Sequence, residues 1–160
     1  MSDDEKREDI QLWGDARDEA LGACKDIIAG WGLTMPQVEP FVLDFGLGRF
    51  DQVGEVEFWV ANEKDEGYCG KFLFVFDGQT CPYHHHDMKH ETFFVLKGAV
   101  KMVVDGREVV KREGDLLPMP PGTDHSFTGQ GPALLLEVSK PCLVGDNFFQ
   151  DKSVGRDGVI

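Results

Sequence analysis

Hydrophobic residues recur every three or four positions between about residues 5 and 28, with charged residues between them. The apolar positions are Ile10, Trp13, Ala16, Ala20, Ala23 and Ile27. This spacing places apolar side chains on one face of a helix. The pattern therefore predicts an amphipathic helix, and Gly30 and Gly32 are expected to end it.

A different pattern begins after Pro36. Short runs of Val, Phe, Leu and Trp alternate with Gly, Asp and Asn, which predicts a series of antiparallel strands over residues 41–137. Residues 99–104 and 107–111 flank Asp105-Gly106, a signal for a two-residue hairpin turn. Proline cannot occupy a central strand, so residues 118–122 are expected to form the turn that leads to His125.

Length and composition fit one compact domain. The chain has 160 residues, 41% of them hydrophobic, with 12 Phe, enough for one core. No apolar run approaches the roughly 20 residues that span a bilayer, and the acidic first residues are unlike a signal peptide, so we expect a cytoplasmic protein.

The net charge of -13 disfavours nucleic acid and membrane partners. Four cysteines without a Cys-x2-Cys pair are expected to be buried thiols rather than disulfides or ligands.

Four residues with metal-binding side chains form the main functional signal. His84 and His86 are two positions apart, so on an extended chain both point to one face while His85 points away. Glu91 and His125 are expected to complete the site from neighbouring strands. Three imidazoles and one carboxylate form a site for a divalent metal ion, and such a mixed set accepts Mn, Fe, Co, Ni and Zn.

The spacing of these ligands resembles the two sequence motifs of the cupin superfamily. The first is Gly78-x5-His84-x-His86-x4-Glu91-x6-Gly98, and the second is Gly114-x5-Pro120-x-Gly122-x2-His125. The second motif usually ends in Asn, where this chain has Gly129. The resemblance implies an all-β fold, a double-stranded β-helix or cupin jelly roll, with an N-terminal α-helix. We expect a helical segment over 1–35, the cupin barrel over 36–145 and a tail over 146–160 that packs on the barrel.

A narrower resemblance involves further short motifs. They are Asp44-Phe-Gly-Leu-Gly48, Tyr68-Cys-Gly-Lys71, Gly78-Gln-Thr-Cys-Pro82 and Lys89-His-Glu91-Thr-Phe93. Together they resemble the D-lyxose isomerase family of cupins, over about residues 44–137. The resemblance implies a metal-dependent interconversion of unphosphorylated aldoses and ketoses, D-lyxose with D-xylulose and D-mannose with D-fructose, through an enediolate. It implies manganese as the metal, whereas the ligand set by itself also accepts zinc, iron, cobalt and nickel.

Three residues are candidates for proton transfer and charge stabilisation. Glu137 lies in an otherwise almost wholly apolar strand, where loss of hydration makes a carboxylate a better general base. Lys71, on an alternating strand, can donate to a substrate oxygen. Both match functional positions of the family. Lys89 ranks third, because a loop lysine is usually exposed; His85 and His90 are expected beside the site or at the surface.

Other functions use the same fold and ligands. A phosphosugar isomerase would need clustered Arg or Lys, whereas the arginines here are scattered. An Fe(II) dioxygenase would use the same four ligands, and a sugar-binding cupin without catalytic activity is the third alternative. An exposed sheet in a small jelly roll is commonly covered by a second copy, so we expect a homodimer.

Overall fold

Two antiparallel sheets and one long helix make up the computed structural model, which describes residues 8–160. The helix is α2 (Gly14–Gly30). The strands are β1 (Phe41–Leu43), β2 (Glu55–Glu63), β3 (Tyr68–Val75), β4 (Thr80–His85), β5 (Glu91–Lys97), β6 (Ala99–Val104), β7 (Arg107–Arg112), β8 (Leu116–Met119), β9 (His125–Gly129), β10 (Ala133–Ser139) and β11 (Phe148–Phe149). No helix within these residues is long and apolar enough to cross a membrane.

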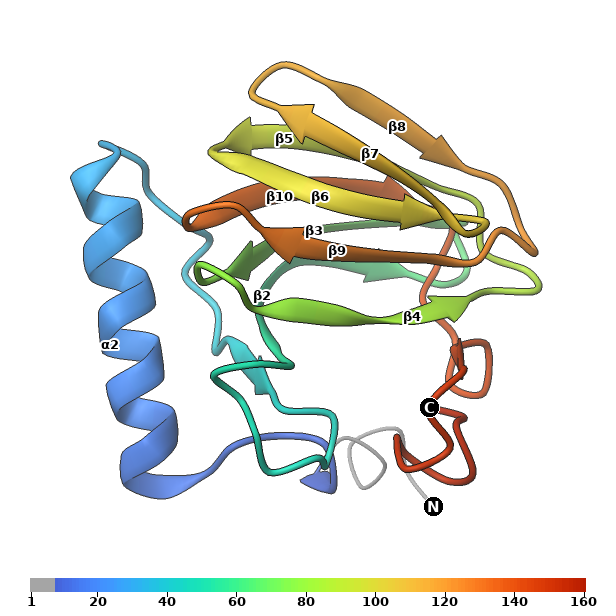
Figure 1. The fold of residues 1–160 in the computed structure, drawn as a ribbon, viewed down its shortest axis with the longest axis horizontal. Coiled ribbons are helices and arrows are strands. Elements are labelled where there is room, and N and C mark those ends of the chain that lie inside the picture. The colour runs from blue at the N-terminus through green and yellow to red at the C-terminus, as the bar shows by residue number, and fades with distance from the viewer. Residues whose placement is uncertain (1–7) are drawn as a thin grey trace.

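The sheets are stacked as a jelly roll, which confirms the predicted all-β cupin fold with an N-terminal helix. One sheet has the order β1-β2-β3-β10-β5-β8 and the other β11-β4-β9-β6-β7. Neighbours such as β3 and β10 are far apart in the sequence, so the central part of the larger sheet depends on long-range pairing. Figure 1 shows α2 to one side of the stacked strands and the C-terminal segment below β4.

Strand alternation divides the apolar residues into two cores. Inward-facing side chains such as Leu73, Leu135 and Phe127 fill the space between the sheets. Outward-facing residues of the larger sheet, among them Phe74 and Leu134, pack against α2. The larger sheet is therefore buried on both faces beneath α2, and its inner face also borders the functional site.

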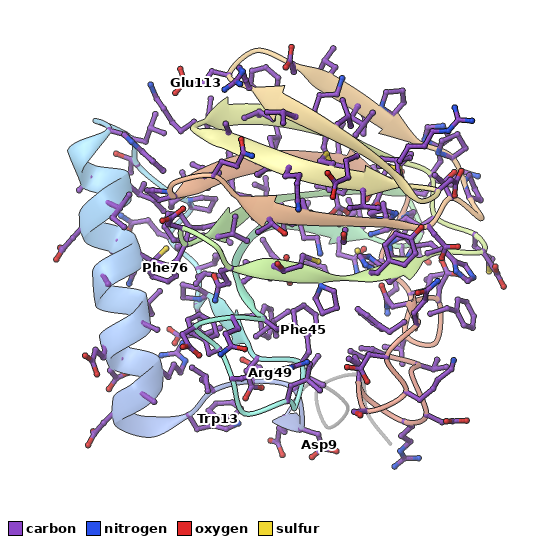
Figure 2. All side chains as sticks on the ribbon, viewed as in Figure 1. Asp9, Trp13, Phe45, Arg49, Phe76 and Glu113 are labelled. Carbon is purple, nitrogen blue, oxygen red and sulfur yellow. The ribbon has the colours of Figure 1, made fainter. Side chains whose placement is uncertain are left out.

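The helix begins later than the sequence pattern predicts. Residues 5–7 lie outside the described residues, and residues 9–13 are not helical. Ile10 is buried at 3% exposure, and its carbonyl accepts a hydrogen bond from the Asp44 N–H at 3.0 Å. Trp13 is 57% exposed at the start of α2 (Figure 2). In residues 9–13, pairing with the β1 region outweighed helix propensity. Gly14, at φ 63°, then changes the direction of the chain at the start of α2. Its end at Gly30 agrees with the prediction.

Two local predictions about the strands have different outcomes. The Asp105-Gly106 hairpin is confirmed, because both residues have positive φ (46° and 76°), as a primed turn requires. The predicted turn over 118–122 starts too early: Pro118 lies in β8, paired with Thr92. Proline is tolerated there because β8 is an edge strand of its sheet.

Candidate metal centre

The four predicted ligands come together at one end of the barrel. His84 lies in β4 and pairs with His125 at the start of β9, while Glu91 begins β5. Their ligand atoms all lie within 4.8 Å of one another, and all four residues are buried. His85 points to the other face, where its ring stacks on Phe148 with centroids 5.2 Å apart. The two-residue period of the strand thus separates the ligands from His85.

Backbone carbonyl groups orient all three imidazoles. Nδ1 of His84 lies 2.7 Å from the Pro82 oxygen, Nδ1 of His86 2.8 Å from the Asp146 oxygen, and Nδ1 of His125 2.9 Å from the Thr123 oxygen. A carbonyl oxygen only accepts, so each Nδ1 carries the proton and donates it. Each Nε2 is therefore left with a free lone pair, as in a metal-ligating histidine.

These lone pairs face a carboxylate. Oε1 of Glu91 is 2.8 Å from Nε2 of His125 and 3.4 Å from Nε2 of His86. Within residues 8–160, these three atoms are buried and have no hydrogen-bond partner. Acceptors this close repel one another unless a cation lies between them. Ligands about 2.1 Å from one ion stand about 3.0 to 3.4 Å apart in octahedral or tetrahedral geometry, so the group fits a divalent metal ion.

The ionisation of the ligands also suits a cation. Burial, with smaller effects of His125 and His86, lowers the pKa of His84 well below its usual value, so this imidazole is neutral and able to bind metal. Burial alone would raise the pKa of Glu91. The Lys89 ammonium beside it opposes burial, and the pKa of Glu91 lies well below its usual value. Glu91 is therefore a carboxylate at neutral pH.

A chain of alternating charges extends from the metal group into the barrel. Nζ of Lys89 is 2.7 Å from Glu91 and 3.0 Å from Glu137. Nζ of Lys71 is 3.7 Å from Glu137 and 2.7 Å from Glu57. All five side chains are buried. Lys71 and Glu137 face each other in the β3–β10 register, so strand pairing brings the predicted catalytic residues together.

These groups line one cavity of about 60 Å³. Three of the metal ligands, His84, His86 and Glu91, line the cavity together with Lys71 and Glu137. Ile10 and Ile160, near the two ends of the described chain, also line it. A polar ligand of a few atoms that enters here touches the metal group and the charged chain at once.

The site differs from the sequence predictions at several residues. Lys89, the third-ranked candidate, is not exposed as a loop lysine usually is: its exposure is 4%, because two carboxylates surround its ammonium. Glu55 and Glu57 were not identified, although their two-residue spacing in an apolar strand was a weak signal for one shared inward face. Asp146 was not predicted either. Its carboxylate accepts hydrogen bonds from the backbone N–H groups of residues 87–89.

The remaining histidine and aromatic candidates lie at the edges of the site. His90 is exposed. Phe93 and Phe127 are 2% and 1% exposed in the core between the sheets, and they also line the cavity. The Nδ1 atom of His85 lies 3.0 Å from the Asp124 carboxylate near the surface.

Comparison with known proteins identifies similar families and relatives. The D-lyxose isomerase family model matches residues 11–105, and the cupin domain model matches residues 72–139. The chain is 31% identical to the D-lyxose ketol-isomerase of Cohnella laeviribosi over 179 residues, covering 92% of this chain and 95% of the relative. It is 32% identical to the D-lyxose ketol-isomerase of Thermofilum sp. (strain ex4484_79), covering 72% and 78%.

Solved structures share the whole architecture. The L-ribose isomerase of Acinetobacter sp. DL28, solved with L-ribose, superimposes with a TM-score of 0.73 over 94% of this chain and 98% of that one. Sequence identity is 16%, so this likeness concerns the fold. The match extends beyond the cupin barrel to include the helix.

Proposed function

Because the chain belongs to the D-lyxose isomerase family of cupins, we propose that it is a metal-dependent aldose–ketose isomerase acting on an unphosphorylated sugar. D-lyxose with D-xylulose and D-mannose with D-fructose are the proposed pairs. One observation carries the proposal: His84, His86 and Glu91 of the buried ligand group line the same cavity as Glu137. An isomerase of this type needs a Lewis acid and a base within reach of adjacent carbons.

The ligand group would hold the ion through three imidazoles and one carboxylate. When bound, the ion supplies Lewis acidity that polarises the sugar's C1 and C2 oxygens. The protein must then remove the proton from C2 of the aldose and return it to C1, through an enediolate. The remaining steps depend on groups of the chain itself.

Glu137 is the proposed base. Its carboxylate is held by the Lys89 ammonium at 3.0 Å and by the Ser139 hydroxyl, which donates to it at 3.1 Å. These contacts fix its orientation at the cavity, where it can take a proton from one carbon and deliver it to the next. The same carboxylate serves both carbons, because they are adjacent in the substrate.

Lys71 and Lys89 are proposed as hydrogen-bond donors and charge stabilisers rather than bases. Burial lowers the pKa of each ammonium, but the facing carboxylates outweigh burial and raise both pKa values above the usual range. Both side chains therefore remain charged at neutral pH. A charged donor near the developing enediolate stabilises its negative oxygen.

The charge of the cavity supports a sugar without phosphate. Three glutamates, Glu57, Glu91 and Glu137, surround the two ammonium groups of the cavity, so both ammonium groups are already paired. Within the described part of the chain, no arginine lines the cavity. A phosphate group would find no free cation to bind, whereas neutral hydroxyl groups match the available donors and acceptors.

Manganese is the proposed ion, since a mixed nitrogen and oxygen ligand set accepts it and the family resemblance favours it.

A homodimer is proposed because Val60 and Val138, on strands β2 and β10, are 58% and 52% exposed on the outer face of the larger sheet. Metal analysis and light scattering test these two points. The cytoplasmic location stays a prediction.

The first test is an assay for ketose formation. Protein stripped of metal and reloaded with Mn(II) is incubated with D-lyxose, D-mannose and D-xylose, and with their phosphates for comparison. We expect ketose from a free sugar only when metal is present. Ketose from the phosphates alone would point to a phosphosugar isomerase. No ketose from any substrate, despite full metal occupancy, would favour the sugar-binding cupin, and oxygen consumption would favour the dioxygenase.

Glu137→Gln tests the proposed base. The amide keeps the size of the side chain but cannot accept the proton, so turnover should fall by roughly 10² to 10⁴. Metal content should stay unchanged, because Glu137 is not one of the four grouped ligands. The control is Glu108→Gln, at an exposed position of β7.

In deuterated water, solvent deuterium in the product supports proton transfer through an enediolate, and its absence supports a hydride shift.

A further inference from the structure

Two cysteines meet at the wall of the cavity, and the proposed chemistry uses neither. Cys69 lies in β3, and Cys142 follows the end of β10. Their Sγ atoms are 3.7 Å apart although the residues are 73 positions apart in the chain. Both are free thiols, and Cys142 is half-buried and lines the cavity. The fold, rather than local sequence, creates this pair.

Asn62 holds the two thiols together. It pairs with Cys69 across the β2–β3 register. Its side-chain amide donates to the Cys142 carbonyl at 3.1 Å and accepts from the Cys142 N–H at 2.9 Å. These two hydrogen bonds to its backbone hold Cys142 in the way that a neighbouring strand would. The short sulfur separation is therefore supported by a specific set of contacts.

The two thiols have different surroundings. The hydrogen bond with Cys69 and the ammonium groups of Lys71 and Lys89 outweigh burial and lower the pKa of Cys142 to about 7. Nζ of Lys89 lies 3.7 Å from its sulfur. The pKa of Cys69 is raised by its hydrogen bond with Cys142 and by burial. Cys142 is thus suited to be the attacking thiolate, and Cys69 the thiol that reacts second.

We propose that Cys69 and Cys142 are an oxidisable pair that a peroxide converts into an intramolecular disulfide at the cavity wall. The Cys142 thiolate attacks one peroxide oxygen, the O–O bond breaks, and the leaving oxygen takes a proton to become water. The resulting sulfenic acid reacts with Cys69, forming the S–S bond and releasing a second water. The two sulfurs supply the two electrons that reduce the peroxide. Bond formation needs an approach of roughly 1.7 Å, from 3.7 Å to about 2.05 Å.

The disulfide would change the catalytic cavity. It removes the thiolate beside Lys89, whose ammonium also binds Glu137. It also draws the Cys142 sulfur toward Cys69 on β3. This consequence rests on the proposed function: the oxidised protein should isomerise sugar more slowly than the reduced protein, and reduction should restore the rate.

Peptide mass spectrometry of the full-length protein after hydrogen peroxide treatment tests the pair. We expect a peptide that joins Cys69 to Cys142 and has lost two hydrogens, and dithiothreitol should reverse it. Cys142→Ser should slow the oxidation of Cys69 by about tenfold or more, because the attacking thiolate is gone. Cys24→Ala is the matched control, since Cys24 lies on the buried face of α2 and its loss should leave the crosslink unaffected.

Two results would overturn the proposal. One is that Cys142 remains a thiol at a peroxide concentration that oxidises free glutathione. The other is that Cys142 advances to sulfinic acid without forming the Cys69 crosslink. The crosslink is read from mass alone, so it is independent of the isomerase assay. If peroxide forms the crosslink but the reduced protein makes no ketose, the proposed function is refuted and the proposal of an oxidisable thiol pair is retained.

Discussion

Burial sets the protonation of single residues around the cavity, and Glu55 illustrates the effect. Burial and the neighbouring Glu57 charge raise the pKa of Glu55 well above its usual value. The folded protein therefore keeps a proton that the unfolded chain releases above about pH 4.5. The contribution of protonated Glu55 to the free energy of unfolding is fully present below that pH. It is lost progressively as the pH rises toward the raised pKa of Glu55 in the folded protein.

Glu55→Gln should remove this dependence on pH. The amide resembles the protonated carboxyl group but does not ionise when the chain unfolds. At pH 8 we expect the variant to be more stable than the wild type by on the order of 1 to 3 kcal/mol, and at pH 4 about equally stable. Urea unfolding of metal-free protein across this range measures the difference. Parallel curves for both proteins would show that Glu55 ionises freely in the folded state.

At the level of elements, close backbone contacts decide which residues the turns accept. Gly129 ends β9, where cupin motifs usually have Asn. A Cβ atom added at Gly129 would lie 2.3 Å from the Phe76 carbonyl oxygen and 2.8 Å from that of Gly131. The Gly129 carbonyl also accepts a hydrogen bond from the Gly78 N–H at 2.9 Å. The departure from the motif therefore reflects the close approach of the chain at residues 76–79.

Gly129→Asn restores the usual motif residue and should nevertheless destabilise this protein. Relief of the clash requires a shift of the backbone, with a cost of about 2 kcal/mol or more. Gly131→Asn is the control: a Cβ there meets no atom within 4 Å, and Asn tolerates the positive φ of 72°. Urea midpoints compare the two variants. Equal losses would mean that the contact at Gly129 has no special cost.

At the scale of the whole molecule, the C-terminal segment supports the metal group from a distance in sequence. The Asp146 carbonyl accepts a hydrogen bond from His86 Nδ1 at 2.8 Å. Its carboxylate accepts from the N–H groups of Asp87, Met88 and Lys89 at 2.9, 3.0 and 3.1 Å. Phe149, in β11, stacks on His84 with centroids 4.9 Å apart. The segment thus orders the loop between the ligands His86 and Glu91.

Asp146→Ala should weaken metal binding while the barrel remains folded. Loss of the carboxylate frees three N–H groups of the loop and loosens His86, so affinity for Mn(II) or Zn(II) should fall by about 10- to 100-fold. Competition with a chelating dye measures this affinity. The control is Asp151→Ala, in the same segment, whose carboxylate contacts Ser153 and Arg49 instead. Equal affinities for the two variants would contradict a supporting role for Asp146.

Local patterns were sufficient to predict part of this protein. The Asp105-Gly106 hairpin follows from turn chemistry, and the shared direction of His84 and His86 follows from the two-residue period of a strand. Both features depend on neighbouring residues only. The motif spacings around Glu91 and His125 extended the prediction to the jelly roll and to the composition of the metal group. None of these features required knowledge of which strands lie side by side.

Tertiary structure decided the rest, because long-range pairing determines what surrounds each side chain. Residues 9–13 pair with the β1 region instead of continuing the predicted helix. Lys89 is buried because Glu137, 48 positions away, lies on the strand beside β5. The order β2-β3-β10-β5 likewise brings Glu57 to Lys71 and places Cys69 against Cys142. Such contacts join segments far apart in the chain, so only the folded arrangement of strands determines them.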